Sequence, residues 1–107
     1  MNWISLTNKQ DFETAINEGG LFAVFKHSTR CSISSMAKSR LEREWNFGTE
    51  LPIYYLDLLN FRDISSSIEA ISGIQHESPQ LIVFKNGKPI YSASHNGIDV
   101  SEILEKA

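Results

Sequence analysis

The stretch LFAVFKHSTRCSISSMAKSRLEREW, residues 21–45, decides the fold, because it joins a buried strand to an amphipathic helix through one short polar segment. Residues 21–25 are apolar and partly β-branched or aromatic, which is typical of a buried strand. The polar residues 27–30 end this strand. Beyond Cys31, apolar residues recur at spacings of three and four, which predicts a helix with a core face of Ile33, Met36, Ala37, Leu41 and Trp45. Cys31 therefore opens the helix.

Cys31 is the only cysteine of the chain. The first amides of a helix lack intrahelical partners and carry the positive end of its dipole, so a thiolate there is stabilised relative to the thiol. Arg30 adds to this effect if its side chain turns toward the sulfur. The alternative is an inert buried cysteine, since cysteine is among the most often buried residue types. Its polar neighbours Thr29, Ser32 and Ser34 favour the reactive interpretation.

Length and composition predict a single domain over residues 1–107. A net charge of -3 offers no basic surface for nucleic acid. The N-terminal MNWISLTNKQ lacks a signal-peptide pattern, and no apolar run reaches membrane-spanning length. One cysteine forbids an internal disulfide, which fits a reducing compartment. We therefore expect a cytoplasmic protein that has neither nucleic acid nor a membrane as a partner.

The elements that flank residues 21–45 follow from local signals. A short strand is expected over residues 3–6, followed by a helix that Thr7 or Asn8 caps and Gly19 ends. After the Cys31 helix, the apolar residues 53–58 predict another buried strand. A third helix then ends at Gly73, and its core face is expected to carry Ile64, Ile68 and Ile71.

The C-terminal part predicts a hairpin and a last helix. Strands over residues 80–84 and 90–93 are joined by an Asn-Gly turn, which is a strong hairpin signal. The last helix is expected to be capped by Asp99 or Ser101 and to carry Ile98, Val100, Ile103 and Leu104. The order β-α-β-α-β-α-β-β-α predicts an α/β protein with a central mixed sheet flanked by helices. It places Cys31 at the carboxyl end of a strand, where ligands collect in open α/β sheets.

This order of elements, with a cysteine opening the second helix and a proline before the hairpin, resembles the thioredoxin fold over nearly the whole chain. Two stretches carry the resemblance. RCSIS, residues 30–34, stands where that family has its redox motif, and SPQLIVFKNGKPI, residues 78–90, is similar to its cis-proline strand and Lys-Asn-Gly turn. The resemblance implies that the Ser78–Pro79 bond is cis and that it lies against Cys31.

The longer string HSTRCSISSMAKSRLEREW, residues 27–45, is similar to the YtxJ-type proteins of the bacillithiol system, the monothiol bacilliredoxins. Their usual motif reads Thr-Cys-Pro-Ile-Ser, and this chain departs from it with Ser32 in place of the proline and Arg30 before the cysteine. The matching residues are His27, Ser28, Thr29, Cys31, Ile33 and Ser34. The resemblance implies no tightly bound cofactor, bacillithiol or a similar low-molecular-weight thiol as co-substrate, and S-thiolated client proteins as partners.

A single cysteine restricts the chemistry, because release of a mixed disulfide within one chain needs a second thiol. Ser34 stands in that second place and cannot resolve the disulfide. We therefore expect the Cys31 thiolate to attack an S-thiolated client, take over the small thiol and release the client cysteine. Ser34 is expected to donate a hydrogen bond to the thiolate, or else to be a surface serine that only caps helix amides. Thr29, Ser78 and Pro79 are expected to align an extended substrate.

Two other functions remain compatible with these residues. Cys31 and Ser34 have the C-x-x-S spacing with which monothiol glutaredoxins hold an iron-sulfur cluster, although Ser-Ile stands where Gly-Phe is usual. A non-catalytic thioredoxin-fold module would instead bind a peptide beside Pro79, with Cys31 incidental. We expect no metal site, since no close-spaced set or zinc pattern is formed by the histidines at positions 27, 76 and 95.

Overall fold

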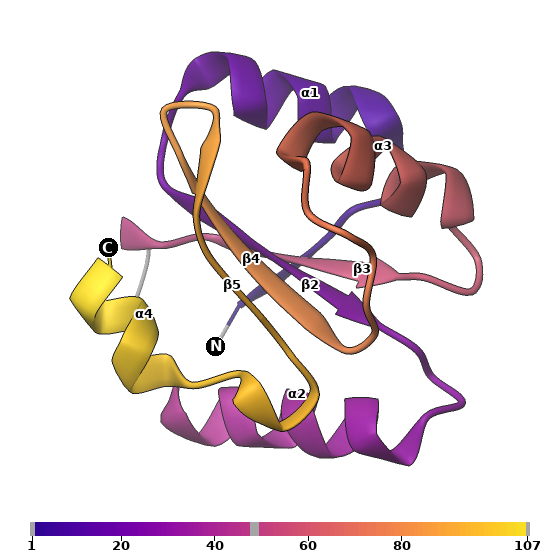
Figure 1. Ribbon diagram of the computed structural model, residues 1–107, viewed down its shortest axis with the longest axis vertical. Helices are drawn as coiled ribbons and strands as arrows, with labels where there is room; N and C mark the ends of the chain where they lie inside the picture. Colours follow the sequence, from indigo (N-terminus) through magenta and orange to yellow (C-terminus); the bar gives the residue numbers. More distant parts are fainter. Residues whose placement is uncertain (1, 48–49, 107) are drawn as a thin grey trace.

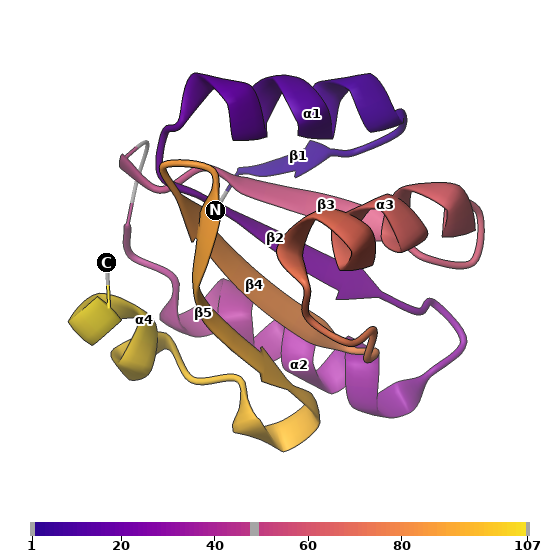
Figure 2. The same ribbon diagram turned by 45° about the horizontal axis from the view of Figure 1, so that its top comes forward.

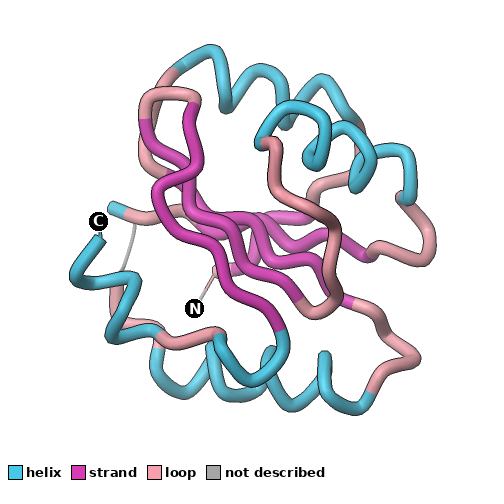
Figure 3. Tube along the Cα trace, viewed as in Figure 1, coloured by secondary structure: helices cyan, strands magenta, loops and turns pink. Residues whose placement is uncertain are grey.

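The computed structural model describes residues 2–47 and 50–106, and within them a five-stranded sheet is covered by helices on both faces (Figures 1 and 3). The strands are β1 (Trp3–Ser5), β2 (Phe22–His27), β3 (Ile53–Asp57), β4 (Gln80–Lys85) and β5 (Lys88–Ser94). The helices are α1 (Lys9–Glu18), α2 (Ser32–Glu44), α3 (Arg62–Ser72) and α4 (Val100–Lys106), with the short 3-10 helix η2 (His95–Gly97) before α4. The predicted order of elements and the α/β class are confirmed.

The strand β2 occupies the middle of the sheet, whose order is β1-β3-β2-β4-β5. It runs parallel to β3 and antiparallel to β4, while β1 pairs parallel with β3 and β5 antiparallel with β4. The strand ends at His27, where the polar residues begin, and it includes Lys26 and His27 beyond the apolar run 21–25. Its ladder with β3 extends to the pair His27 and Asp57, and all six residues of β2 are buried.

The helices lie in two layers, with α1 and α3 on one face of the sheet and α2 and α4 on the other (Figures 1 and 2). Because successive strand residues point to opposite faces, β2 contributes to both cores. Phe22 and Val24 pack in the core that contains Phe12 of α1 and Ile68 of α3. The other core combines residues of β2, α2 and α4, namely Ala23, Phe25, Ala37, Leu41, Val100 and Ile103.

The buried face of α2 differs from the predicted one. Ala37 and Leu41 are buried as expected, but Ile33 and Met36 are 46% and 69% exposed. The third fully buried residue of this helix is Ser34, so the buried positions are 34, 37 and 41. Apolar spacing alone misjudged this face, because it gives no weight to a polar side chain that finds hydrogen-bond partners inside the protein.

The ends of α3 and α4 show the same limit of apolar spacing. Ile71 and Leu104, both predicted in core faces, are 43% and 57% exposed. Ile98 is buried as predicted, but it precedes α4 and does not belong to it. Asp99 is the capping residue, since its Oδ1 accepts a hydrogen bond of 2.9 Å from the Ser101 amide.

No helix among residues 2–47 and 50–106 is long and apolar enough to span a membrane.

The local signals for turns and caps are confirmed. Asn8 Oδ1 accepts a 2.8 Å hydrogen bond from the Asp11 amide, and α1 ends at Gly19, whose φ of 76° is the left-handed conformation that glycine adopts easily. Asn86 and Gly87 have φ angles of 55° and 76°, as an Asn-Gly hairpin turn requires. The Asn86 amide donates to the Gly19 carbonyl, which joins the hairpin turn to the end of α1.

Replacement of Leu41 by alanine tests the buried face of α2. We expect Leu41→Ala to lower the free energy of unfolding by about 2–5 kcal/mol, because it leaves a cavity in the core. Met36→Ala is the matched control, and we expect it to cost no more than about 0.5 kcal/mol, since the side chain is mostly in water. Urea denaturation followed by circular dichroism measures both values. Equal losses would contradict the assigned face.

Candidate active site

Cys31 lies where the sequence predicted it, as the N-cap residue of α2, with extended backbone angles (φ -107°, ψ 119°). Its amide donates to the Ser28 carbonyl over 3.1 Å, and its carbonyl accepts the first helical hydrogen bond, from the Ser35 amide, over 3.1 Å. The thiol is partly exposed and makes no capping hydrogen bond, and the first turn of α2 has no acidic residue. Cys31 therefore lies at the positive end of the helix, with no carboxylate in that turn to oppose it.

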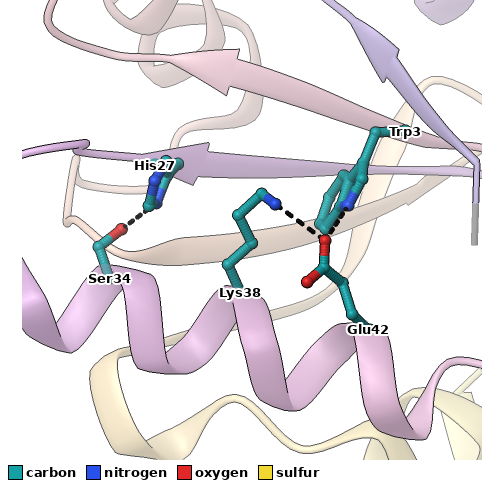
Figure 4. Close-up of polar contacts among 5 residues, drawn as sticks. All are labelled: Trp3, His27, Ser34, Lys38 and Glu42. Atoms are coloured by element: carbon teal, nitrogen blue, oxygen red, sulfur yellow. Dashed lines mark hydrogen bonds and ion pairs between the residues drawn. The ribbon is translucent and has the colours of Figure 1, made fainter.

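Ser34 is fully buried behind the first turn of α2, so it is not a surface serine. Its Oγ lies 2.6 Å from His27 Nδ1 (Figure 4). The same oxygen accepts a hydrogen bond of 3.1 Å from the Ser28 amide. Burial and the nearby charge of Lys38 lower the pKa of His27, which keeps the ring neutral at neutral pH. The ring tautomer decides the direction of this bond: the hydroxyl donates when the ring proton is on Nε2, and Nδ1 donates when the proton is there. Among the described residues, the hydrogen-bond partners of this hydroxyl are thus His27 and Ser28, and donation to the Cys31 thiolate stays a prediction.

Three other predicted site residues, Thr29, Arg30 and Ser32, are exposed next to Cys31 in the chain. Within the described part of the chain, none of their side chains makes a hydrogen bond or an ion pair. They are therefore available to a substrate or to the thiolate. Their assignment to thiolate support and substrate binding stays a prediction.

The Ser78–Pro79 peptide bond is cis, as the resemblance implied. Pro79 is buried, and its carbonyl accepts a hydrogen bond of 3.0 Å from the His95 amide. The next residue, Gln80, is paired in register with Lys26 of β2. The cis-proline therefore lies beside the end of β2 from which the segment with Cys31 departs. Direct contact between Pro79 and the sulfur stays a prediction.

A second polar cluster lies on the opposite face of the sheet, and no sequence pattern pointed to it. Lys26 is completely buried, and its Nζ lies 3.3 Å from Nδ1 of His76, in the segment between α3 and β4. Ser65 Oγ is 3.1 Å from the same ring nitrogen, and the His76 amide donates to Glu69 Oε2 over 2.7 Å. Because a lysine is rarely fully buried, nothing in the sequence predicted a contact between Lys26 and His76. That contact is seen only in the tertiary structure.

The charges of this cluster follow from its burial. Burial lowers the pKa of Lys26 to about 8, partly opposed by the carboxylate of Glu69. Burial and the charge of Lys26 lower the pKa of His76. At neutral pH the lysine is therefore mostly charged and donates to a neutral imidazole, which must carry its own proton on Nε2.

The histidines do not gather in one place. His27 faces α2, His76 contacts Lys26 on the other face of the sheet, and His95 is exposed in η2. Among residues 2–47 and 50–106, no group of three or more His, Cys, Asp or Glu side chains is placed to hold a metal ion.

Comparison with solved structures establishes the class of protein. A candidate oxidoreductase with a thioredoxin fold is 32% identical with a TM-score of 0.85, and the match covers 97% of this chain and 92% of that one. Oxidised thioredoxin from Plasmodium falciparum matches at 17% identity and a TM-score of 0.74, over 98% and 97% of the two chains. A mutant thioredoxin from Halobacterium salinarum matches at 10% and 0.73, over 97% and 86%. The fold, with one cysteine at the start of α2, defines a thioredoxin-like protein of the monothiol kind.

The particular family follows from the sequence comparison. The model of the monothiol bacilliredoxin family BrxC matches residues 4–103. The chain therefore belongs to this family, and the resemblance found in residues 27–45 is confirmed. Thiol redox chemistry is the function that the family and the single cysteine indicate.

Replacement of Ser34 by alanine tests the buried hydrogen bonds behind Cys31. We expect Ser34→Ala to lower the free energy of unfolding by about 1–3 kcal/mol, because it leaves the Ser28 amide and His27 Nδ1 without their partner. Ser35→Ala is the matched control on the exposed side of α2, and we expect a change within about 0.5 kcal/mol. Urea denaturation measures both, and equal effects would show that the Ser34 contacts contribute nothing.

The buried Lys26 predicts a stability change at alkaline pH. Its folded pKa of about 8 lies below the ordinary value of 10.5, so the unfolded chain binds more protons between these two values. We therefore expect the free energy of unfolding to rise with pH over this interval, relative to Lys26→Met, and the difference to be constant below it. Urea midpoints of both proteins across this range provide the measurement. Parallel curves would contradict the lowered pKa.

Proposed function

We propose that this protein is a monothiol thiol-disulfide oxidoreductase that removes bacillithiol, or a similar low-molecular-weight thiol, from S-thiolated client proteins. The observation that carries the proposal is the placement of Cys31, partly exposed at the N-cap of α2, with a serine three residues later. A thiolate in this position is a nucleophile, whereas Ser34 cannot expel a partner from the mixed disulfide.

The exchange takes two steps. The Cys31 thiolate attacks the sulfur of the small thiol in the client disulfide, a new disulfide forms between Cys31 and the small thiol, and the client cysteine leaves as a thiolate that takes a proton from water. A second molecule of the small thiol, as its thiolate, then attacks this mixed disulfide. It forms the symmetrical small-thiol disulfide and releases the Cys31 thiolate, so each step exchanges one disulfide for another without net oxidation.

The surrounding residues contribute to binding and to thiolate stability in this proposal. Arg30 and Ser32 provide positive charge and a hydrogen-bond donor beside the thiolate, and both are exposed. The backbone of Ser78, before the buried cis-Pro79, offers hydrogen bonds to an extended client segment. Thr29 is exposed two residues before Cys31 in the chain, and it provides a further hydroxyl to the substrate. In this proposal the small thiol is a substrate, and the two exchange steps need no cofactor besides it.

The reaction is tested with a peptide that carries bacillithiol on one cysteine. We expect wild-type protein to release the free peptide thiol and to acquire a bacillithiol adduct on Cys31, identified by mass spectrometry. Cys31→Ser, which keeps the size of the side chain, is expected to do neither. The same peptide carrying glutathione measures the preference between the two small thiols.

Three results would contradict the proposal. A wild-type protein that forms no adduct and releases no peptide thiol is not this enzyme. A visible chromophore after anaerobic reconstitution with iron and sulfide, in the absence of exchange, would instead favour an iron-sulfur carrier. Full cellular activity of Cys31→Ser would favour a binding module.

A further inference from the structure

The last two residues of β2, Lys26 and His27, are polar but buried, with exposures of 0% and 5%. They point to opposite faces of the sheet, since strand side chains alternate. Each contacts one of the two segments that border the candidate site. We call residues 28–34, which contain Cys31, the cysteine loop, and residues 74–79, which end at the cis-proline, the proline loop.

His27 attaches the cysteine loop to the sheet. Its Nδ1 is 2.6 Å from Ser34 Oγ (Figure 4). That oxygen also accepts from the Ser28 amide, so the Ser34 hydroxyl joins both ends of the loop to the imidazole. The ring is itself held, because it stacks on Phe25 at 5.8 Å and packs against Tyr55 at 5.5 Å between ring centroids. The segment that contains Cys31 is therefore attached to a ring whose own orientation is held by packing.

Lys26 attaches the proline loop to the same strand. Its ammonium donates to His76 Nδ1 over 3.3 Å, and the His76 backbone amide is fixed by Glu69 of α3. Gln80 also shapes this loop, through the Gln75 carbonyl at 3.0 Å and the Glu77 amide at 3.3 Å. The Gln80 contacts attach the proline loop to β4, the strand that follows it in the chain. The Lys26 contact attaches it to β2.

Stability does not explain a buried lysine at this position. Removal of an ammonium from water costs several kcal/mol, and an apolar side chain of similar volume is often neutral or stabilising in its place. Lys26 has no ion pair within 4 Å in the described part of the chain, where the ion pair is Lys38 with Glu42. Ser65 and Glu69 of α3 also contact His76, and what Lys26 adds is a link from β2 to this residue, three positions before Pro79.

We infer that Lys26 and His27 are positioning residues, which set the cysteine loop and the proline loop relative to each other from the two faces of one strand. His27 positions the nucleophile, and Lys26 positions the surface that aligns the substrate. The part of this inference that concerns substrate alignment rests on the proposed function. The two residues therefore have separable effects on catalysis.

Lys26→Met tests the proline-loop arm, because methionine fills a similar volume without a donor. We expect KM for the bacillithiolated peptide to rise about tenfold, because the released proline loop must be ordered again when the peptide binds, with kcat unchanged. Alkylation of Cys31 by iodoacetamide, which needs no alignment on the proline loop, is expected to stay at the wild-type rate. Lys85→Met, at an exposed lysine of β4, is the matched control.

His27→Phe tests the cysteine-loop arm, because phenylalanine keeps a ring and removes the hydrogen bond to Ser34. We expect the rates of Cys31 alkylation and of peptide turnover both to fall about tenfold. His27→Asn is expected to restore most of both rates, since its amide places a polar atom close to that of Nδ1. His95→Asn is the control, at an exposed histidine whose positive φ of 54° asparagine also adopts.

Hydrogen exchange reports on the two arms without any substrate. Lys26→Met is expected to speed amide exchange in residues 74–79 alone, and His27→Phe in residues 28–35 alone, in proteins whose circular dichroism is unchanged. Unchanged exchange in both segments, or equal changes of KM, kcat and alkylation in both variants, would overturn the inference. Wild-type protein that fails to turn over the peptide would overturn the proposed function instead, and the exchange and alkylation results would still decide the inference.

Discussion

Enclosure of β2 is the constraint on which the rest of the structure depends. Its backbone pairs with β3 on one side and β4 on the other, and helices cover both of its faces. A strand enclosed in this way leaves its polar side chains without access to water, so they must find partners inside the protein. Lys26 and His27 find them in His76 and Ser34, which belong to the two segments that border Cys31 and Pro79. The candidate site is thus built from the requirements of the core.

The chemistry of the site follows from what lies near the sulfur. Cys31 has the unpaired amides at the start of α2 beside it, and no acidic residue in the first turn. Ser34, three residues later, stands where a resolving thiol would be needed, but its hydroxyl is committed to His27 and the Ser28 amide. A chain with one cysteine cannot form an internal disulfide, so any disulfide that Cys31 forms joins it to another molecule. Membership of the BrxC family agrees with this limit.

The success of the sequence predictions depended on how local each signal was. The cap at Asn8, the end of α1 at Gly19 and the Asn86-Gly87 turn each need only a few neighbouring residues, and all three were correct. Core faces depend on how far a helix lies from the sheet and which way it is turned. Apolar spacing therefore placed Met36 and Leu104 in the core, although both are exposed. Spacing shows that a helix is amphipathic, but it does not show where its contact with the sheet ends.

By itself, the sequence determined the order of the elements, the position of Cys31 at a helix start and, through the family resemblance, the cis bond before Pro79. These features follow from local propensities and short motifs. Only the tertiary structure decided which groups the Ser34 hydroxyl and the Lys26 ammonium contact. The physical reason is that these hydrogen bonds join residues 7 and 50 positions apart, and their partners meet only when the strands pair and the helices cover them. A local sequence pattern does not show which residues will be neighbours across such separations. Buried polar side chains need hydrogen-bond partners, and only the folded structure shows which partners lie within reach.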